Sequence, residues 1–264
     1  MEGALARTDL IGDLEREPLR NVVLLKHLAA FPEHIIGYRA TDHAGTAAHL
    51  VVLDARASAY DREVYPTAAS VALVSSNHAA MTARVIDFMP GDRGIVFKLA
   101  NAVDREVVAS RFPIELKAAF HSFTAESKFE RDQDVQTSIE PSDTAIALLE
   151  SQGHPRDWLL PLLRSGRAFV CNLDLGGKLA SVCIAFQSYG HVWEVGGVVT
   201  PEPFRGRGFA GRVVRTALAL LSERALVPRY QVNRENQASL SVARKTGLKH
   251  FLTLEHHLYD PSRK

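Results

Sequence analysis

The sequence has few of the features that mark secreted, membrane-bound or nucleic-acid-binding proteins. Only two of its 264 residues are cysteines, and no run of about 20 apolar residues is present that could span a bilayer. Lys and Arg number 31 against 30 Asp and Glu, so the net charge is only +1 and no broad basic face for nucleic acid is expected. The first residues show no charged leader followed by an apolar core. These absences favour a cytoplasmic protein that binds neither nucleic acid nor membrane.

The chain does contain enough apolar material for a large core. Hydrophobic residues make up 46% of it, and its length allows one large domain or two of ordinary size. A polar, charged stretch over residues 125–134 separates two halves, and Ser142 then provides a helix N-cap signal. We therefore expect an N-terminal α/β domain over residues 1–132 and a second domain over residues 138–264.

The two cysteines, Cys171 and Cys183, flank a turn centred on Gly176-Gly177. Counting outward from that centre places Cys171 opposite Val182 and Cys183 opposite Val170, on opposite faces of the hairpin. This register predicts no disulfide, and the two residues are expected to be buried free thiols.

Hydrophobic periodicity predicts a mixture of helices and strands in both halves. In the first half the spacing indicates helices over 10–30, 79–88 (with Asn77 as cap) and 103–110, and strands over 47–53, 69–74 and 94–99. In the second half it indicates helices over 143–151, 155–163, 209–224 and 236–246, and strands over 168–174, 179–187, 191–200, 229–232 and 250–259. Motifs that carry chemistry are found only in the second half.

The strand over residues 191–200 is followed by two prolines, Pro201 and Pro203. Because proline has no backbone N–H, the strand cannot stay paired with its neighbour beyond Thr200. The backbone groups of Val198, Val199 and Thr200 are therefore expected to be free to pair with a ligand.

A loop rich in glycine and arginine then leads into a long amphipathic helix. Glycines let the backbone approach a ligand closely, and the first N–H groups of a helix attract anions together with neighbouring arginines. The loop is therefore predicted to hold a phosphate group. The residues expected to hold it are Arg205, Gly206, Arg207, Gly208, Phe209 and Ala210.

The same loop also matches Gly-x-Gly-x-x-Gly through Gly206, Gly208 and Gly211, the pattern of dinucleotide-binding folds. Such a fold needs a carboxylate at the end of the next strand to hold the ribose, but that strand ends in Asn233. Only two predicted strands follow the loop, too few for a doubly wound sheet that starts there. A dinucleotide-binding oxidoreductase is therefore a less favoured alternative.

A second pattern lies over residues 236–248. Asn236 can cap a helix, and Ser239 and Ala243 lie one turn apart on the same face of it. Gly247 suits a left-handed helix stop, and Leu248 provides the apolar contact that follows such a stop.

Together the two patterns resemble the GNAT superfamily of N-acetyltransferases. Arg205, Gly208 and Ala210 are similar to its Arg/Gln-x-x-Gly-x-Gly/Ala signature, and residues 236–248 are similar to its second signature. The resemblance implies an α/β (α+β) fold over about residues 138–262, with a mixed, mostly antiparallel sheet flanked by helices. The first half resembles the N-terminal part of two-domain members, including the glycine N-acyltransferase-like branch, in which it is a degenerate GNAT-like copy.

The resemblance also implies a reaction. Acetyl-CoA, or another acyl-CoA, would be the cosubstrate, with no metal, and a primary amine of a small molecule would attack it directly in a ternary complex. The pantetheine arm would pair with residues 198–200 and contact Asn236, Ser239 and Ala243. Glu194 is the candidate general base and His191 the next choice, while backbone N–H groups of Val198 or Val199 would stabilise the oxyanion. A homodimer is left open.

One position departs from the family pattern. Many members have a tyrosine where this chain has Ala243, and that tyrosine returns a proton to the CoA thiolate. Water or one of Tyr189, Tyr230 and Ser241 would have to replace it.

Arg167, Trp158 and Trp193 are expected to line the acceptor cleft. A non-catalytic acyl-CoA-binding protein is the main alternative function.

Overall fold

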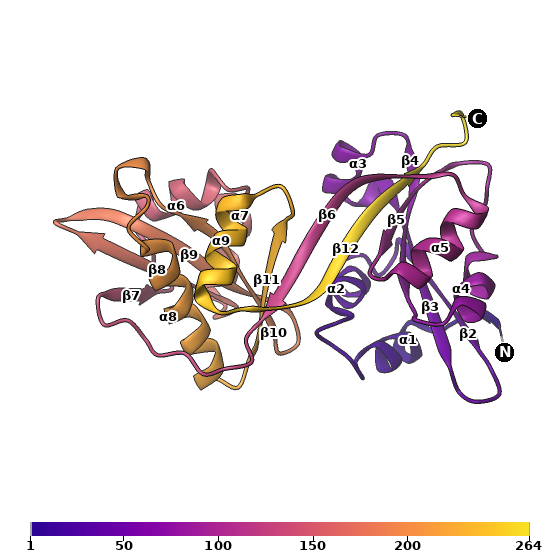
Figure 1. The fold of residues 1–264 in the computed structure, drawn as a ribbon, viewed down its shortest axis with the longest axis horizontal. Coiled ribbons are helices and arrows are strands. Elements are labelled where there is room, and N and C mark those ends of the chain that lie inside the picture. The colour runs from indigo at the N-terminus through magenta and orange to yellow at the C-terminus, as the bar shows by residue number, and fades with distance from the viewer. Residues whose placement is uncertain (1, 264) are drawn as a thin grey trace. The chain divides into compact units, whose positions relative to one another are not determined.

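The computed structural model describes residues 2–263, which form two compact units (Figure 1). The first unit comprises residues 2–120 and 252–263, and the second comprises His121–Phe251. This division differs from the expected boundaries, 1–132 and 138–264, at both ends. The last strand, β12 (Lys249–Tyr259), begins in the second unit, and its residues 255–259 pair with β5 (Gly94–Leu99) of the first. Strand β6 (Ile114–Thr124) spans the other division point and was not predicted.

The first unit contains a sheet in the order β1-β2-β3-β4-β5-β12. The pairs β1–β2, β2–β3, β3–β4 and β5–β12 are antiparallel, and β4–β5 is parallel. Its remaining elements are β1 (Glu2–Ala4), α1 (Arg7–Leu14), α2 (Val22–Ala30), β2 (Ile35–Thr41), β3 (Ala47–Asp54), η1 (Ala55–Ala57), α3 (Ala59–Val64), β4 (Ala68–Ser75), α4 (Ala79–Ile86) and α5 (Ala102–Arg111).

Strands β3, β4 and β5 and helices α4 and α5 confirm the predictions for this half to within a few residues. The predicted cap of α4 is wrong: its N-cap is His78, whose side chain makes no capping bond, and Ser76 Oγ accepts the His78 N–H at 3.1 Å. Strands β1 and β2 and helix α3 were not predicted, because each is short or lacks a clear apolar period.

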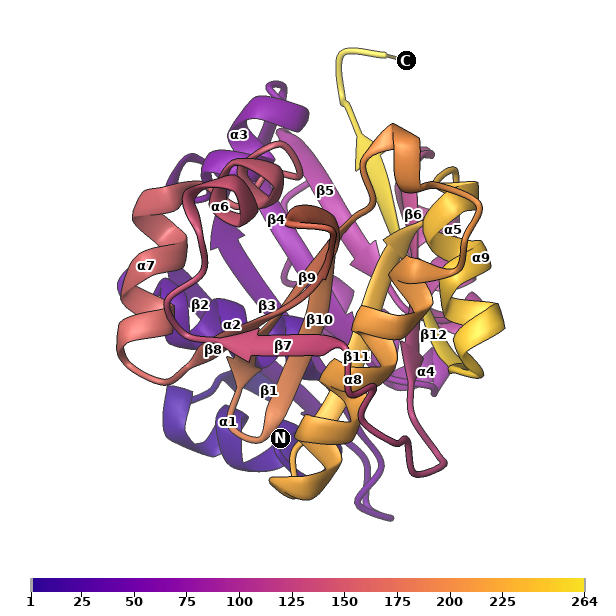
Figure 2. The same ribbon diagram turned by 90° about the vertical axis from the view of Figure 1, so that its left-hand side faces the viewer.

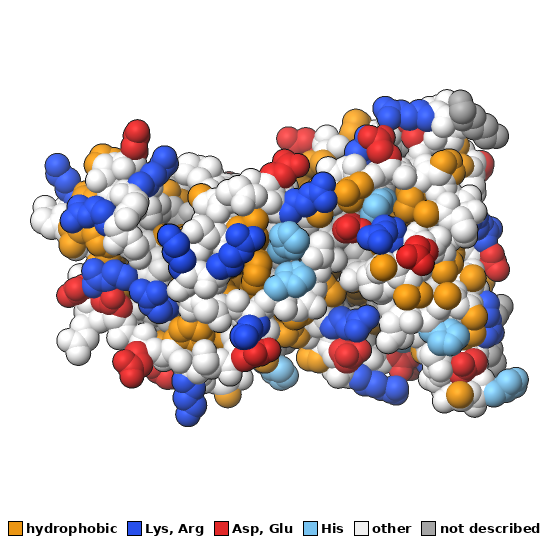
Figure 3. Space-filling view, in the orientation of Figure 1, with side chains coloured by type: hydrophobic (Ala, Val, Ile, Leu, Met, Phe, Trp, Pro, Cys, Tyr) orange, Lys and Arg blue, Asp and Glu red, His pale blue; other side chains and the backbone are white. Residues whose placement is uncertain are grey.

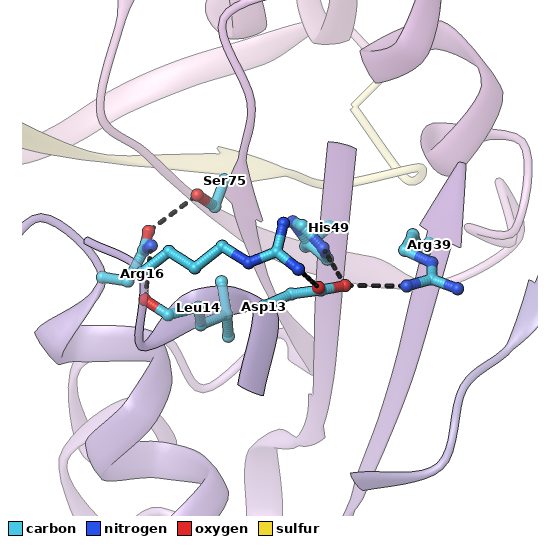
Figure 4. Close-up of polar contacts among 7 residues, drawn as sticks. Asp13, Leu14, Arg16, Arg39, His49 and Ser75 are labelled. Carbon is cyan, nitrogen blue, oxygen red and sulfur yellow. Dashed lines mark hydrogen bonds and ion pairs between the residues drawn. The ribbon is translucent and has the colours of Figure 1, made fainter. Parts of the chain in front are cut away.

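The single helix predicted over residues 10–30 is in fact two helices, α1 and α2. Pro18 lies between them and cannot continue a helical hydrogen-bond ladder. Asn21 joins the pieces, because its Nδ2 donates to the Leu14 carbonyl at 3.0 Å and its Oδ1 accepts from Ser75 Oγ at 2.7 Å. Asp13 of α1 accepts hydrogen bonds from Arg39 at 2.8 Å and His49 at 3.1 Å (Figure 4). These contacts hold both helices against β2, β3 and β4.

The second unit contains a sheet in the order β6-β11-β10-β9-β8-β7. The pairs β7–β8, β8–β9 and β9–β10 are antiparallel, and β10–β11 is parallel. The expected mixed, mostly antiparallel sheet flanked by helices is therefore confirmed. Its remaining elements are β7 (Val135–Ser138), α6 (Asp143–Glu150), α7 (Arg156–Arg164), β8 (Ala168–Leu175), β9 (Lys178–Tyr189), β10 (Val192–Val199), η2 (Glu202–Phe204), α8 (Phe209–Glu223), β11 (Val227–Asn233) and α9 (Gln237–Thr246).

Helices cover both faces of this second sheet. Figure 2 shows α6 and α7 on one side and α8 and α9 on the other. One apolar cluster, which includes Leu149, Leu159 and Ile184, lies beneath α6 and α7. A larger cluster, which includes Val213 and Leu240, lies beneath α8 and α9. Ser142 caps α6 as predicted, with its Oγ accepting the Ala145 N–H at 3.3 Å.

Cys171 and Cys183 are free and buried, as predicted, but the predicted register of their hairpin is wrong. Asp174 pairs with Leu179, whereas Leu173 pairs with Ser181, so a one-residue bulge lies between these pairs. The bulge shifts every later pair by one residue, which places Cys171 directly opposite Cys183 on one face. Both thiols pack in the cluster beneath α8 and α9.

The two units share one order of elements. Each has a strand, two helices, three antiparallel strands, a helix, a strand parallel to the last of those three and another helix. The first unit differs by the insertion of η1 and α3 between β3 and β4. Within the described range, no helix is both long and apolar enough to cross a bilayer.

Candidate functional site

The two parallel strands of the second unit separate partway along their length. β10 pairs with β11 at only three positions, the last of which joins Glu194 to Arg229. Over the described residues, Val195–Val199 of β10 then continues without a partner on β11. The corresponding strands of the first unit, β4 and β5, stay paired as far as Leu73 and Lys98. The second unit therefore has an opening that the first unit lacks, at the end of β10 where the prolines predicted it.

A β-bulge lies on the other edge of β10, beside the opening. Gly196 is opposite Ile184, but Val199 is opposite Val182, so β10 contains one extra residue here. Gly197 has a φ of +57°, which lies in the left-handed region that favours glycine. The bulge releases Gly197 and Val198 from regular pairing with β9, next to the strand end predicted to bind the pantetheine.

The glycine loop leads from this opening into the N-terminus of α8. Gly208, with a φ of +80°, is the N-cap residue, and no side chain caps the helix. The first N–H groups of α8, at Phe209, Ala210 and Gly211, therefore keep the capacity to bind an anion. Gly206 also has a positive φ, of +77°.

The loop arginines have defined contacts. Arg205 Nε donates to the Thr200 carbonyl at 3.1 Å and so ties the loop to the end of β10. The Arg207 guanidinium lies 4.8 Å from the centre of the Phe209 ring, a cation–π contact. Both arginines are exposed, and Lys and Arg side chains gather over this face of the second unit (Figure 3). The surface around the α8 N-terminus is therefore suited to a diphosphate.

Two of the backbone groups expected to be free are already occupied. Ser181 Oγ on β9 donates to the Val199 carbonyl at 3.1 Å and is 2.9 Å from the Thr200 hydroxyl. The Thr200 carbonyl accepts from Arg205. These side chains fix the end of β10 but leave its edge toward β11 open.

Helix α9 has the caps that the sequence predicted. Asn236 Oδ1 accepts the Ser239 N–H at 3.0 Å, and Gly247 ends the helix with a φ of +88°. The Leu248 N–H reaches back to the Ala243 carbonyl at 3.1 Å, and the Ala243 side chain is fully buried.

Of the hydroxyl groups considered as proton donors, that of Tyr230 lies against α9. It is 2.6 Å from Ser239 Oγ, and Tyr230 is buried. Burial raises the pKa of Tyr230 to about 12, so the hydroxyl keeps its proton at neutral pH.

Glu194 faces a cation in the sheet. Arg229 Nη1 donates to Glu194 Oε2 at 2.7 Å, and the Arg229 side chain has no exposed surface. Arg229 Nη2 donates to Ser122 Oγ at 3.2 Å, while its Nε has no hydrogen-bond partner among the described residues. Glu194 is therefore the counter-ion of a buried guanidinium.

The structure does not bring His191 to the opening. His191 is exposed at the start of β10, and eight residues of strand at about 3.3 Å each separate it from Val199. Trp193 does not line a cleft as expected, because it is buried in the core beneath α8 and α9. Arg167 donates to Gln187 Oε1 at 2.9 Å on the surface.

The sequence-based prediction missed a titratable side chain that lies beside the bulge. His154, in the loop between α6 and α7, contacts the backbone at Gly197 and stacks on Trp158. Nothing in the local sequence Gly153-His154-Pro155 distinguishes this histidine from an ordinary loop residue. Within the described part of the chain, no cluster of three or more His, Cys, Asp or Glu side chains is placed to hold a metal ion.

Comparison with known proteins finds a family match over part of the chain. Residues 133–248 match the acetyltransferase (GNAT) family. The whole chain is similar in fold to a GNAT-family acetyltransferase from Colwellia psychrerythraea, with 11% identity, 98% of this chain and 100% of that chain covered, and a TM-score of 0.60. It is also similar to a GCN5-related N-acetyltransferase from Sphaerobacter thermophilus, with 10% identity, 99% and 95% covered, and a TM-score of 0.58.

A third similar structure is described as a tandem GNAT protein from the clavulanic acid biosynthesis pathway. It has 12% identity, 100% of this chain and 99% of that chain are covered, and the TM-score is 0.53. No curated protein matches the chain. At these identities the structural likeness concerns the fold alone, and it extends over both units.

Proposed function

We propose, from the match of residues 133–248 to the acetyltransferase (GNAT) family, that the chain belongs to this family and transfers an acetyl group from acetyl-CoA to a primary amine of a small molecule. The observation that carries the proposal is the separation of β10 and β11 beyond Glu194 and Arg229, next to the uncapped N-terminus of α8. An extended pantetheine arm can pair with the open edge of β10 while its diphosphate binds the helix N-terminus.

The reaction follows from the groups around the opening. Backbone N–H groups at Val198 or Val199 would stabilise the oxyanion that forms when the amine attacks the thioester carbonyl. Both residues lie at or beside the bulge, which fixes their orientation. The thiolate of CoA is a good leaving group, and Tyr230 offers a protonated hydroxyl beside α9.

We infer that the first unit is a degenerate copy of the second and does not bind CoA. The two units share the order and direction of their elements, but the link from β4 to α4 in the first unit is Ser76-Asn77-His78, without glycine or arginine. Its strands also stay paired where those of the second unit separate. We therefore expect one CoA site per chain.

Titration calorimetry with CoA and with NAD tests the cofactor assignment. We expect one CoA bound per chain and no heat with NAD. Gly208→Ala should weaken CoA binding about tenfold or more, because a side chain at φ +80° strains the loop. Gly177→Ala is the matched control, since Gly177 has a φ of +74° and an equally open surrounding but lies in the β8–β9 turn. NAD binding, or equal effects of the two substitutions on CoA binding, would contradict the assignment.

Thiol release from acetyl-CoA with a panel of amines separates an enzyme from a binding protein. A non-catalytic acyl-CoA-binding protein is the second candidate, because Ala243 replaces the tyrosine of many relatives. That candidate predicts CoA binding without thiol release for every amine. The enzyme predicts release that depends on one class of amine.

A further inference from the structure

The loop between α6 and α7 places an imidazole on the bulge of β10. A Cβ atom added at Gly197 would lie 2.9 Å from His154 Cδ2 and 3.1 Å from His154 Nε2. One added at Gly196 would lie 4.0 Å from the same Nε2. The Cδ2–Nε2 edge of the ring therefore rests on the strand backbone next to Val198, where the thioester carbonyl of the proposed acetyl-CoA would lie.

Two aromatic rings hold this imidazole in place. His154 stacks on Trp158 at 5.4 Å between ring centres, with an angle of 28°, and meets Phe186 at 6.0 Å. Its backbone N–H donates to the Leu149 carbonyl at 3.2 Å. Neither ring nitrogen has a hydrogen-bond partner among the described residues. The ring is thus fixed by packing while its nitrogens remain available to a ligand.

Glu194 is poorly placed to take up a proton during the reaction. Its carboxylate balances the charge of Arg229, which is completely buried. Disruption of such a buried ion pair is strongly unfavourable. The His154 ring forms no such ion pair with the described residues.

We propose that His154 is the general base of the acetyl transfer, a role that rests on the proposed function. The amine loses its first proton to solvent and attacks the carbonyl carbon with its lone pair, so a C–N bond forms and the carbonyl π electrons move to oxygen. His154 then accepts the second amine proton through a ring nitrogen. Collapse of the oxyanion breaks the C–S bond, and the CoA thiolate takes up one proton. The products are the amide and free CoA.

The electrostatic surroundings agree with this role. Burial lowers the pKa of His154, and the charge of Glu194, which faces it from β10, acts in the opposite direction. The imidazole is therefore neutral at neutral pH and able to accept a proton. On the helices beside the imidazole, the Arg156 guanidinium forms an ion pair with Asp143. The backbone N–H of Arg156 donates to the Glu150 carboxylate. These charged groups are therefore paired with one another.

The test uses the full chain with acetyl-CoA and the amine that gives the fastest thiol release. His154→Gln should lower kcat about 100-fold or more, leave the Kd for CoA within about twofold, and remove the acidic limb of the kcat/KM profile against pH. His43→Gln, which changes an exposed histidine in the first unit, is the matched control and should retain the kcat of the unsubstituted protein.

A second variant separates chemistry from folding. His154→Ala leaves a space between Trp158 and Gly197, and added imidazole should restore turnover in proportion to its neutral form. A purely structural role for His154 would give no such rescue. Full activity of His154→Gln with an unchanged pH profile, or no rescue of His154→Ala, overturns the assignment of the base alone. Absence of thiol release from the unsubstituted protein with every amine, while CoA still binds, overturns the proposed function as well.

Discussion

Gly197 shapes the candidate site through its backbone. Its φ of +57° creates the bulge in β10, and its missing side chain leaves room for Leu149 and His154. A Cβ atom there would approach Leu149 Cδ2 to 2.8 Å. The residue thus combines a conformation and a close contact that other residue types cannot provide.

We expect Gly197→Ala to destabilise the protein by about 2 kcal/mol or more, from backbone strain together with overpacking against Leu149 and His154. Gly196→Ala is the matched control, because its new Cβ would have no neighbour closer than 3.9 Å, and it should change stability by less than about 0.5 kcal/mol. Urea unfolding at pH 7 measures both. Equal effects at the two positions would show that the bulge is not the cause.

At the scale of elements, helix α9 depends on its cap. Asn236 Oδ1 satisfies the Ser239 N–H, one of the donors that a helix leaves free at its N-terminus. The helix is short, only 10 residues, so the loss of one cap matters.

Asn236→Ala should lower the free energy of unfolding by about 1 kcal/mol and weaken CoA binding, since the proposed pantetheine contact is lost with the cap. His78→Ala is the comparison, because His78 occupies the same position before α4 but makes no side-chain cap. Its effect on stability should be within about 0.5 kcal/mol. Calorimetric unfolding and CoA titration give the two quantities, and an unchanged unfolding temperature for Asn236→Ala would contradict the expectation.

At the scale of the whole molecule, the first unit keeps the order of elements without the opening. A buried polar cluster occupies its interior instead: Lys98 Nζ lies 2.8 Å from Asp61 Oδ1, and both side chains are almost completely buried. His27 and His256 are buried nearby, where His256 Nδ1 bonds the Tyr65 hydroxyl at 2.8 Å. We therefore expect this unit to lose stability in acid.

Burial, together with the nearby charge of Lys98, lowers the pKa of both His27 and His256 from 6.5 to about 3. At pH values between about 3 and 6.5, these two histidines bind protons in the unfolded chain but not in the folded chain. The free energy of unfolding therefore keeps their full contribution above about pH 6.5 and falls as the pH decreases below it. We expect the urea midpoint to fall steadily from pH 6.5 to pH 4. His256→Leu should make that decline shallower, and an identical pH slope in this variant would refute the assignment to His256.

The sequence by itself determined the second unit in most of its detail. Its apolar periods predicted all four helices and four of its strands, and the caps at Ser142 and Asn236 and the stop at Gly247 followed from local hydrogen-bond geometry. The glycine loop and the prolines that end β10 were also readable, because their effects are set by neighbouring residues. The resemblance to the GNAT superfamily rested on these local patterns.

Tertiary structure decided the rest, because register and contact depend on residues far apart in the chain. One extra residue in the β8–β9 hairpin placed Cys171 and Cys183 on the same face, although opposite faces were predicted. The transfer of the end of β12 to the first unit follows from its pairing with β5, about 160 residues earlier in the chain. The buried partner of Glu194 and the position of His154 on β10 were likewise invisible in the sequence, since each contact joins separate elements whose spacing only the folded sheet fixes.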